Sequence, residues 1–172
     1  MHKTFETERL LIRPTSEDDA ELIYDLMNTP KFIKYVGDRA IDSIEAGASY
    51  IRTKMLPQLH AFGYSNYTLI IKSEGQKIGT CGLYKREGLN GIDLGFALLP
   101  QYEGLGYGYE ASHRLLNAAF EEFDIKEIKG ITTKDNSASQ RLLEKLGLKL
   151  NGTTRLPNED VELLLYKIVK PT

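Results

Sequence analysis

Residues 98–111 read Leu98-Leu99-Pro100-Gln101-Tyr102-Glu103-Gly104-Leu105-Gly106-Tyr107-Gly108-Tyr109-Glu110-Ala111, with three glycines at alternate positions. A β-rich run precedes this stretch and a helical pattern follows it, so the glycines stand where a strand turns into a helix. Without Cβ atoms the backbone can approach a ligand closely and point several N–H groups outward. Those donors and the positive end of the helix dipole suit a pyrophosphate. The alternative is a plain loop with a glycine-softened helix start.

Two other phosphate-binding patterns do not fit this stretch. A Walker loop requires Gly-Lys followed by Ser or Thr, and the chain has no such triplet. A dinucleotide-binding fingerprint requires a glycine where Tyr109 stands. It also requires a parallel strand–helix–strand unit, whereas the preceding strands predict an antiparallel meander.

The elements around the stretch follow from periodicity and turn residues. We expect strands at 10–13, 67–71, 77–84, 92–98, 125–133, about 149–153 and 161–169. We expect a first helix from residue 16 to Pro30 and a second from Asp42 or Ser43 to Pro57, where the proline should kink or end it. Two more follow, from the glycines to about Glu122 and from 137 to Gly147. This order predicts an α+β fold with a mostly antiparallel mixed sheet, in a single domain spanning 1–172.

The composition sets outer limits on function. The 172 residues carry 22 basic and 24 acidic side chains, for a formal net charge of −2, which gives no general attraction to nucleic acid. One cysteine and three scattered histidines do not have metal-ligand spacing, and Cys81 in an apolar run is expected to be a core residue. The N-terminus has no signal-peptide segment and no apolar run is long enough to span a membrane. We therefore expect a cytoplasmic protein with no metal, nucleic-acid or membrane partner.

The glycine stretch resembles the acetyl-CoA motif of the GNAT superfamily, Q/R-x-x-G-x-G/A, before a helix that opens with Glu-Ala. A register starting at Glu103 puts Gly106 and Gly108 on the motif's glycines and residues 110–111 on its Glu-Ala pair. A register starting at Gln101 also fits formally, but we favour the first. Glu103 then replaces the usual Gln or Arg, while the backbone donors do not depend on side-chain identity.

Other motifs resemble the RimJ/RimL-like branch, the ribosomal-protein N-acetyltransferases and their relatives. The similar segments are Thr7-Glu8-Arg9-Leu10-Leu11-Ile12-Arg13-Pro14, Asp93-Leu94-Gly95-Phe96, Asn136-Ser137-Ala138-Ser139 and Leu143-Glu144-Lys145-Leu146-Gly147-Leu148. Together they follow the branch in order and spacing over nearly the whole chain.

This resemblance implies the GNAT fold, in which the strand at 92–98 splays from the strand at 125–133, often at a β-bulge, and the gap holds acetyl-CoA. Backbone groups of 96–98 would bind the acetyl and pantetheine, with the Phe96 N–H as oxyanion donor. Asn136 matches the residue that holds the pantetheine arm. The implied cofactor-binding set is Phe96, Ala97, Leu98, Glu103, Gly104, Leu105, Gly106, Tyr107, Gly108, Tyr109, Asn136 and Ser139.

The resemblance also suggests catalytic residues. Asp93 matches a strand position that often carries the general base, and Glu159 is a second candidate; a salt-bridged strand residue is the alternative for Asp93. Leu143 stands where many relatives have an acid tyrosine, so Ser139 is the better candidate acid, unless it only caps its helix. Tyr35 and Tyr67 lie on segments that form the acceptor side in relatives, where a core role is the alternative.

The predicted activity is transfer of the acetyl group of acetyl-CoA to a primary amine by direct attack in a ternary complex. The acceptor would be a protein or peptide N-terminus or a small amine, and the protein a monomer or homodimer. A non-catalytic acetyl-CoA-binding sensor is the alternative, and a nucleotide-binding module comes third.

Overall fold

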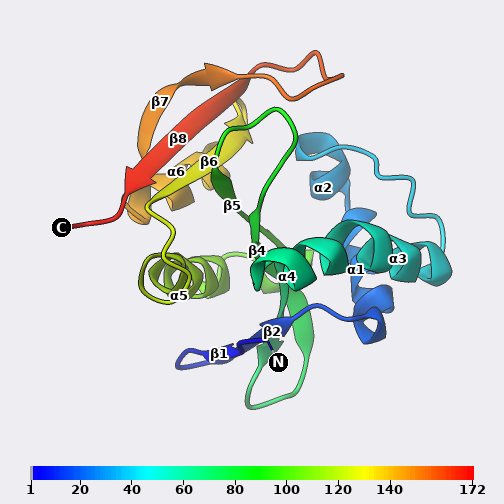
Figure 1. Ribbon diagram of the computed structural model, residues 1–172. Coiled ribbons are helices and arrows are strands. Elements are labelled where there is room, and N and C mark those ends of the chain that lie inside the picture. Colours follow the sequence, from blue (N-terminus) through cyan, green and yellow to red (C-terminus); the bar gives the residue numbers. More distant parts are fainter. Residues whose placement is uncertain (1) are drawn as a thin grey trace.

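The computed structural model describes residues 2–172 and contains an eight-stranded sheet (Figure 1). The strand order is β1-β2-β3-β4-β5-β6-β8-β7, and all neighbouring strands are antiparallel except β5 and β6. The strands are β1 (Phe5–Glu6), β2 (Leu10–Pro14), β3 (Asn66–Ile71), β4 (Lys77–Tyr84), β5 (Ile92–Leu98), β6 (Glu127–Thr133), β7 (Lys149–Thr154) and β8 (Leu163–Val169). The helices are α1 (Ala20–Met27), α2 (Pro30–Tyr35), α3 (Ile44–Tyr50), α4 (Leu56–Phe62), α5 (Tyr107–Glu121) and α6 (Ser137–Lys145). The predicted α+β fold with a mostly antiparallel mixed sheet is confirmed.

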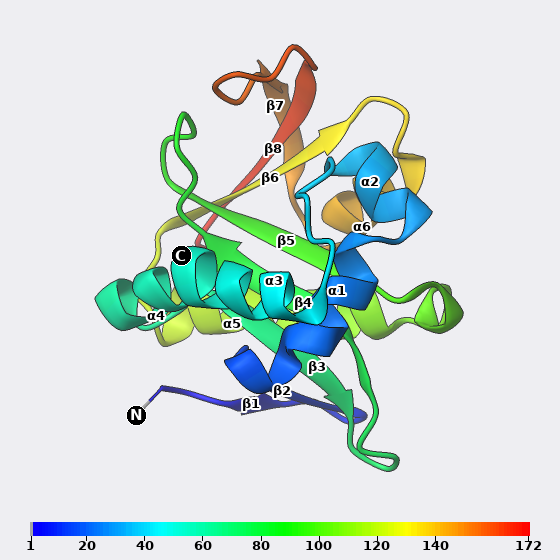
Figure 2. The same ribbon diagram turned by 90° about the vertical axis from the view of Figure 1, so that its right-hand side faces the viewer.

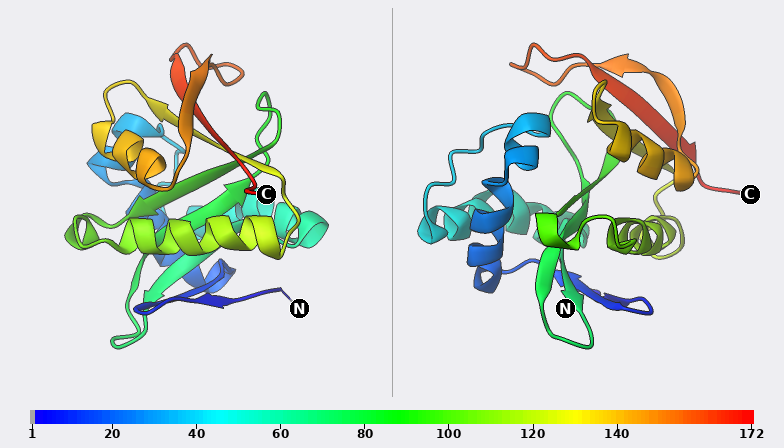
Figure 3. Two further views of the ribbon diagram at one scale, coloured as in Figure 1. Left: turned by 90° about the vertical axis from the view of Figure 1, so that its left-hand side faces the viewer. Right: turned by 180° about the vertical axis from the view of Figure 1, so that it is seen from behind.

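Helices cover both faces of the sheet. Figures 2 and 3 show α1, α3 and α4 on one face, with α5 and α6 on the other. Small residues let α5 and α6 pack close to the sheet. Cys81 Sγ of β4 lies 3.6 Å from the Ser112 hydroxyl of α5. A Cβ on Gly130 of β6 would stand only 2.7 Å from Leu143 of α6. Side chains alternate along a strand, so every second residue of β4, β5 and β6 faces α5 or α6.

Asp19 ties the first helical segment to the sheet. Its fully buried carboxylate pairs with Arg13 at 2.7 Å and with Lys77 at 2.7 Å. It also accepts hydrogen bonds from the Thr68 hydroxyl and the Ser16 N–H, at 2.9 and 3.0 Å. Burial alone raises the pKa of Asp19, but these contacts bring it well below its ordinary value. The carboxylate therefore stays ionised inside the fold.

The first helix ends before Pro30, as expected, but the same proline begins a further helix that the sequence reading missed. Thr29 is the N-cap of α2, and its hydroxyl accepts from the Phe32 N–H at 3.2 Å. Proline fits the first helical position because its missing N–H would have no partner there. The six-residue α2 thus follows α1 after a two-residue break.

The second helix begins where predicted and continues past Pro57. Ser43 is its N-cap and accepts from the Ala46 N–H at 3.0 Å. Between α3 and α4, residues Ile51–Met55 form a π-helical turn. A proline in a regular α-helix collides with the carbonyl four residues before it, and the wider π turn moves that carbonyl aside. The helix therefore runs on to Phe62 instead of ending at the proline.

The sheet opens between β5 and β6. The two parallel strands pair only at Ile92 with Ile128 and at Asp93 with Lys129, and then diverge (Figure 2). The register between β4 and β5 is unbroken, so β5 carries no β-bulge in its pairing with β4, although the resemblance often implies a bulge where the two strands splay. The strands separate because their directions diverge, not because one of them carries an extra residue.

Candidate functional site

Backbone groups of β5 point alternately to its two sides. The Leu99 N–H donates to the Ile78 carbonyl of the β4 side at 2.9 Å. Residues two apart share a direction, so Ala97 also turns its N–H and carbonyl toward β4. Phe96 and Leu98 then direct theirs to the opposite side, where β6 has already diverged. The Phe96 N–H therefore points toward the opening, as an oxyanion donor requires. The Ala97 N–H points toward β4 and has no such orientation.

The glycine-rich turn leads from the end of β5 into α5. Gly104 and Gly106 have φ angles of +75° and +87°, a region that side chains rarely adopt. The first hydrogen bond of the helix runs from the Glu110 N–H to the Gly106 carbonyl. Within the part of the chain that the structure describes, the N–H groups of residues 105–109 donate no hydrogen bond. Five consecutive donors are therefore available to an anion.

Gly108 has a different role, because it lies inside the first turn of α5 with ordinary helical angles. A Cβ at this position would stand 3.4 Å from Leu142 of α6 and 3.7 Å from Leu98 of β5. Both distances are ordinary van der Waals contacts, so the packing of α5 does not itself require a glycine here. The backbone conformation thus favours glycine at Gly104 and Gly106, whereas Gly108 has no such requirement.

A latch from the N-terminal hairpin holds the turn in place. Arg9 Nε donates to Glu110 at 2.7 Å, and its Nη1 donates to the Leu105 carbonyl at 3.0 Å. Its guanidinium lies 4.1 Å from the centre of the Tyr107 ring. Glu110 also accepts from the Thr7 hydroxyl and the Arg9 N–H. Burial alone raises the pKa of Glu110, but these donors bring it below its ordinary value. Sequence reasoning missed this latch, because its partners are about 100 residues apart.

Cationic side chains surround the turn. Glu103, the residue that departs from the motif, forms an ion pair with Lys31 of α2. Lys145 of α6 lies 4.2 Å from the centre of the Tyr109 ring. With Arg9, three positive charges from three separate elements border the turn or the start of α5. The negative charge of Glu103 is thereby compensated.

Asn136 and Ser139 stand at the start of α6, which lies beyond the opening between β5 and β6 (Figure 2). Asn136 Oδ1 accepts from the Ser139 N–H at 3.2 Å, so Asn136 caps the helix. Neither the Asn136 Nδ2 nor the Ser139 hydroxyl hydrogen-bonds to any other described residue. Both side chains are half-buried and keep a free polar group.

Asp93 lies on the sheet face opposite α5, at the point where β5 and β6 begin to separate. It is 1% exposed, and Arg86 Nε donates to both of its oxygens, at 2.9 and 3.0 Å. Burial raises the pKa of Asp93 above its ordinary value, although the Arg86 charge opposes this. The Tyr84 ring covers the neighbouring Gly95, where a Cβ would stand 2.9 Å from it. Asp93 is thus ion-paired, and Tyr84 and Arg86 accompany it on this face.

The remaining predicted residues are not brought together. Glu159 lies in the exposed loop 155–162, and its side chain bonds to no described residue. Tyr35 is half-buried on α2, with Lys34 Nζ 4.9 Å from its ring centre. Tyr67 has no exposed surface, its hydroxyl has no partner among residues 2–172, and burial raises its pKa. It packs 5.7 Å from Phe5 in the core, so an acceptor could reach it only if that packing opened.

Cys81 is confirmed as a core residue. It has no exposed surface, and burial raises the pKa of its thiol to about 12, which makes it a poor nucleophile. Among residues 2–172 no cluster of three His, Cys, Asp or Glu side chains could hold a metal ion. No described helix combines the length and the apolar character needed to cross a bilayer.

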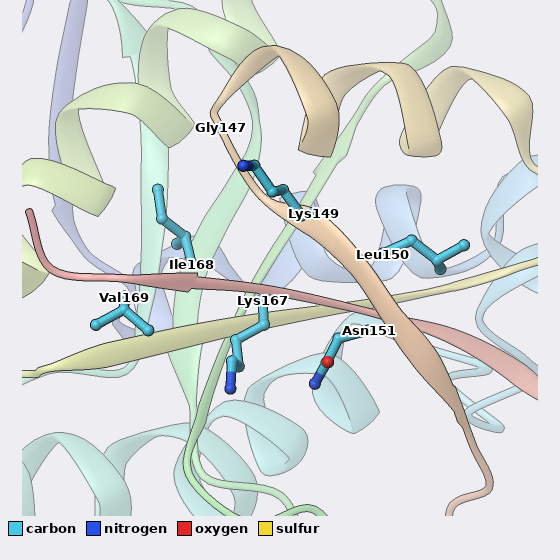
Figure 4. Close-up of a pocket in the computed structure, with 7 residues that line it drawn as sticks. All are labelled: Gly147, Lys149, Leu150, Asn151, Lys167, Ile168 and Val169. Carbon is cyan, nitrogen blue, oxygen red and sulfur yellow. The ribbon is translucent and has the colours of Figure 1, made fainter.

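A hollow of about 310 Å³ lies outside the opening, on the β7–β8 hairpin. Figure 4 shows Lys149 and Lys167, which come from neighbouring strands, among its lining residues. It contains none of the residues predicted for cofactor or catalysis. We therefore assign no chemistry to it.

Comparison with known proteins agrees with this geometry. Residues 9–149 match the family model described as "Acetyltransferase (GNAT) domain". YoaA of Bacillus subtilis strain 168, named an uncharacterized N-acetyltransferase, is 26% identical over 176 residues, which cover 99% of each chain. The crystal structure of an acetyltransferase from Agrobacterium tumefaciens C58 superposes with a TM-score of 0.84 at 24% identity, covering 99% of this chain and 96% of that one. The crystal structure of a spermidine N-acetyltransferase from Vibrio cholerae, in complex with CoA and spermine, superposes with a TM-score of 0.77 at 15% identity. The match covers 95% of this chain and 96% of that one.

The family match spans well over half of the chain, and the sheet opens beside β5, the strand that the glycine motif follows along the sequence. The curated relative and the solved structures match over nearly their whole lengths, so the likeness is not confined to one motif. The chain belongs to the GNAT family of acetyltransferases.

Proposed function

We propose that this acetyltransferase uses acetyl-CoA as donor and transfers the acetyl group to a primary amine by direct attack in a ternary complex. One observation carries the proposal. Free backbone N–H groups occur at two places along the end of β5 and the turn that follows it. One is the opening, at Phe96 and Leu98, and the other is the turn, at residues 105–109. A thioester carbonyl and a pyrophosphate are the two parts of acetyl-CoA that require such donors.

The cofactor would lie along this path. Residues 105–109 would bind the pyrophosphate through their N–H groups, with Arg9, Lys31 and Lys145 nearby as cations. The Asn136 Nδ2, which the helix cap leaves free, would donate to a pantetheine carbonyl. The V. cholerae spermidine acetyltransferase, which has the same fold, was solved with CoA bound, and this supports the assignment.

The chemistry would be carried by few groups. The amine attacks the acetyl carbon, the new C–N bond forms, the C–S bond breaks, and the amine loses a proton as the thiolate gains one. The Phe96 N–H stabilises the negative charge that develops on the carbonyl oxygen. Asp93 is the proposed base, because its raised pKa increases its basicity and it lies where the opening begins. The free Ser139 hydroxyl is the proposed proton donor to the thiolate.

The finer classification rests on the sequence motifs alone. The segments at 7–14, 93–96, 136–139 and 143–148 support membership of the RimJ/RimL-like branch. The latch adds a physical reason for the first of them, because Thr7 and Arg9 hold the turn through Glu110. We propose that the same latch operates in chains that share this opening segment.

Two measurements test the function. Calorimetric titration with CoA should show binding, and ATP, which lacks the pantetheine arm, should bind much more weakly. Thiol release from acetyl-CoA should then be measured over peptides with varied N-termini, polyamines, aminoglycosides and amino acids. Binding of CoA without turnover of any amine would favour a sensor, and ATP binding stronger than CoA binding would contradict the proposal.

A further inference from the structure

Arg86 uses only one of its three nitrogens to hold Asp93. Its Nε donates to both carboxylate oxygens, at 2.9 and 3.0 Å. Its terminal nitrogens, Nη1 and Nη2, donate no hydrogen bond within residues 2–172. Neither belongs to the buried polar atoms that lack a partner, and the side chain is 32% exposed. Four N–H groups of a charged guanidinium therefore remain accessible.

The position of this guanidinium is fixed. Asp93 holds it from one side, and its Cζ lies 4.9 Å from the centre of the Tyr84 ring. Burial lowers the pKa of Arg86, but the charge of Asp93, its hydrogen bond and the nearby Tyr84 and Tyr50 together raise it above its ordinary value, so the group stays protonated. A planar, preorganised guanidinium with two free terminal nitrogens is the partner that a carboxylate binds in a bidentate manner.

Arg86 also stands beside the reacting centre. Its Nη2 lies 3.7 Å from the point where a Cβ of Gly95 would be. The next backbone N–H along β5 is that of Phe96, one residue beyond Gly95. Gly95 leaves open the space that a side chain would otherwise fill. The guanidinium therefore faces the sheet surface from which an acceptor would approach the proposed oxyanion donor.

We propose, resting on the acetyl transfer proposed above, that Arg86 binds the carboxylate of the acceptor and that the acceptor is an α-amino acid. The span supports this class, because the amine and carboxylate oxygens of an α-amino acid are about 3 Å apart by covalent geometry. With the carboxylate on Arg86 beside Gly95, this short span keeps the amine close to the part of β5 that carries the Phe96 N–H, as direct attack requires. The products are the N-acetyl amino acid, CoA and one proton lost by the ammonium group.

The same charge disfavours polycations. A polyamine or aminoglycoside would place further ammonium groups near the guanidinium, and the Asp93 carboxylate is already paired with Arg86. The ammonium groups and the guanidinium are all positively charged, so they repel each other and binding is weakened. The site thus discriminates by charge between amino acids and polyamines.

The unmodified enzyme provides the first test. Acetylation of a panel of α-amino acids should be compared with that of the matched amino-acid amides, the matched decarboxylated amines and spermidine. A bidentate charged pair contributes about 1.5–3 kcal/mol, so kcat/KM should be roughly 10- to 150-fold higher for the acids. Amides or decarboxylated amines that react as well as the acids, or turnover confined to spermidine, would overturn the inference.

Variants give the second test. Arg86→Lys keeps the charge but loses the fork, and should raise the amino-acid KM about tenfold or more, with the CoA Kd unchanged. Arg114→Lys is the matched control, since Arg114 is also 32% exposed, pairs with Glu122 and lies 4.7 Å from the Phe5 ring centre. An equal change in both variants would contradict the assignment. If the unmodified protein does not bind CoA, the result instead contradicts the proposed function itself.

Discussion

Replacing Gly106 with valine should weaken cofactor binding by roughly 100-fold and leave the fold in place. Gly106 has a φ of +87°, where a residue with a Cβ loses about 1–2 kcal/mol. A Cβ would also stand 3.2 Å from Arg9 Nη2, which is the end of a flexible side chain and can move. The turn relieves the strain by changing its backbone angles, and the N–H groups of residues 105–109 then no longer converge.

The loss of affinity follows from those donors. Hydrogen bonds to a charged group contribute about 1.5–3 kcal/mol each. Losing two of them amounts to about 3 kcal/mol or more, which is roughly 100-fold in Kd at 1.4 kcal/mol for each factor of ten. Thermal stability should fall by only a few degrees, since about 1 kcal/mol lowers the Tm of a chain of this size by about 2–4 °C.

Calorimetric titration with CoA and a thermal melt measure both quantities. Gly63→Val is the matched control, because Gly63 ends α4 with a φ of +84° and has nothing within 4 Å of its Cβ position. The control should lose a similar few degrees and bind CoA like the parent. A Gly106→Val protein that binds CoA within threefold of the parent would refute the assignment of the turn.

Three further predictions concern other parts of the molecule. Asn136→Ala should mainly weaken CoA affinity and Ser139→Ala should mainly lower kcat, about tenfold or more if the hydroxyl is the acid; equal small effects in steady-state kinetics would indicate capping alone. Asp93→Asn should lower kcat/KM at neutral pH and recover as pH approaches the amine's own pKa, whereas an unchanged pH–rate profile would move the role to Glu159. Asp19→Asn should lower the free energy of unfolding by about 3 kcal/mol or more near pH 7, because two cations lose their buried partner. The pKa of Asp19 is depressed in the fold, so its contribution is complete above about pH 5 and is lost as pH falls toward the folded pKa; urea titrations should show parent and variant converging in acid.

Local sequence patterns predicted the parts of the fold that depend on neighbouring residues. The strands at 77–84 and 92–98 are found with the predicted bounds, because alternation and flanking turn residues act within a few positions. The start of α5 and the free donors before it follow from glycine chemistry in the same way. Pro30 was interpreted only as the end of the first helix, so the short α2 that it begins was not predicted.

The site could be predicted only where backbone geometry decides it. Phe96 was predicted from the resemblance to the GNAT family, and the direction of its N–H away from β4 follows from strand alternation. Arg86 was not predicted, because its importance comes from a partner across the hairpin and from the Tyr84 ring beneath it. Arg9 was quoted only as part of a motif, since no local pattern joins it to a glutamate 101 residues away.

The latch between the N-terminal hairpin and α5 connects the proposed cofactor site to the edge of the sheet. Strands β1 and β2 lie at that edge, and β1 is only two residues long, so this segment is expected to open locally before the protein unfolds. Each opening releases Glu110 and disorders the turn. CoA should therefore slow amide hydrogen exchange in β2, and mild warming should weaken CoA binding before the core melts.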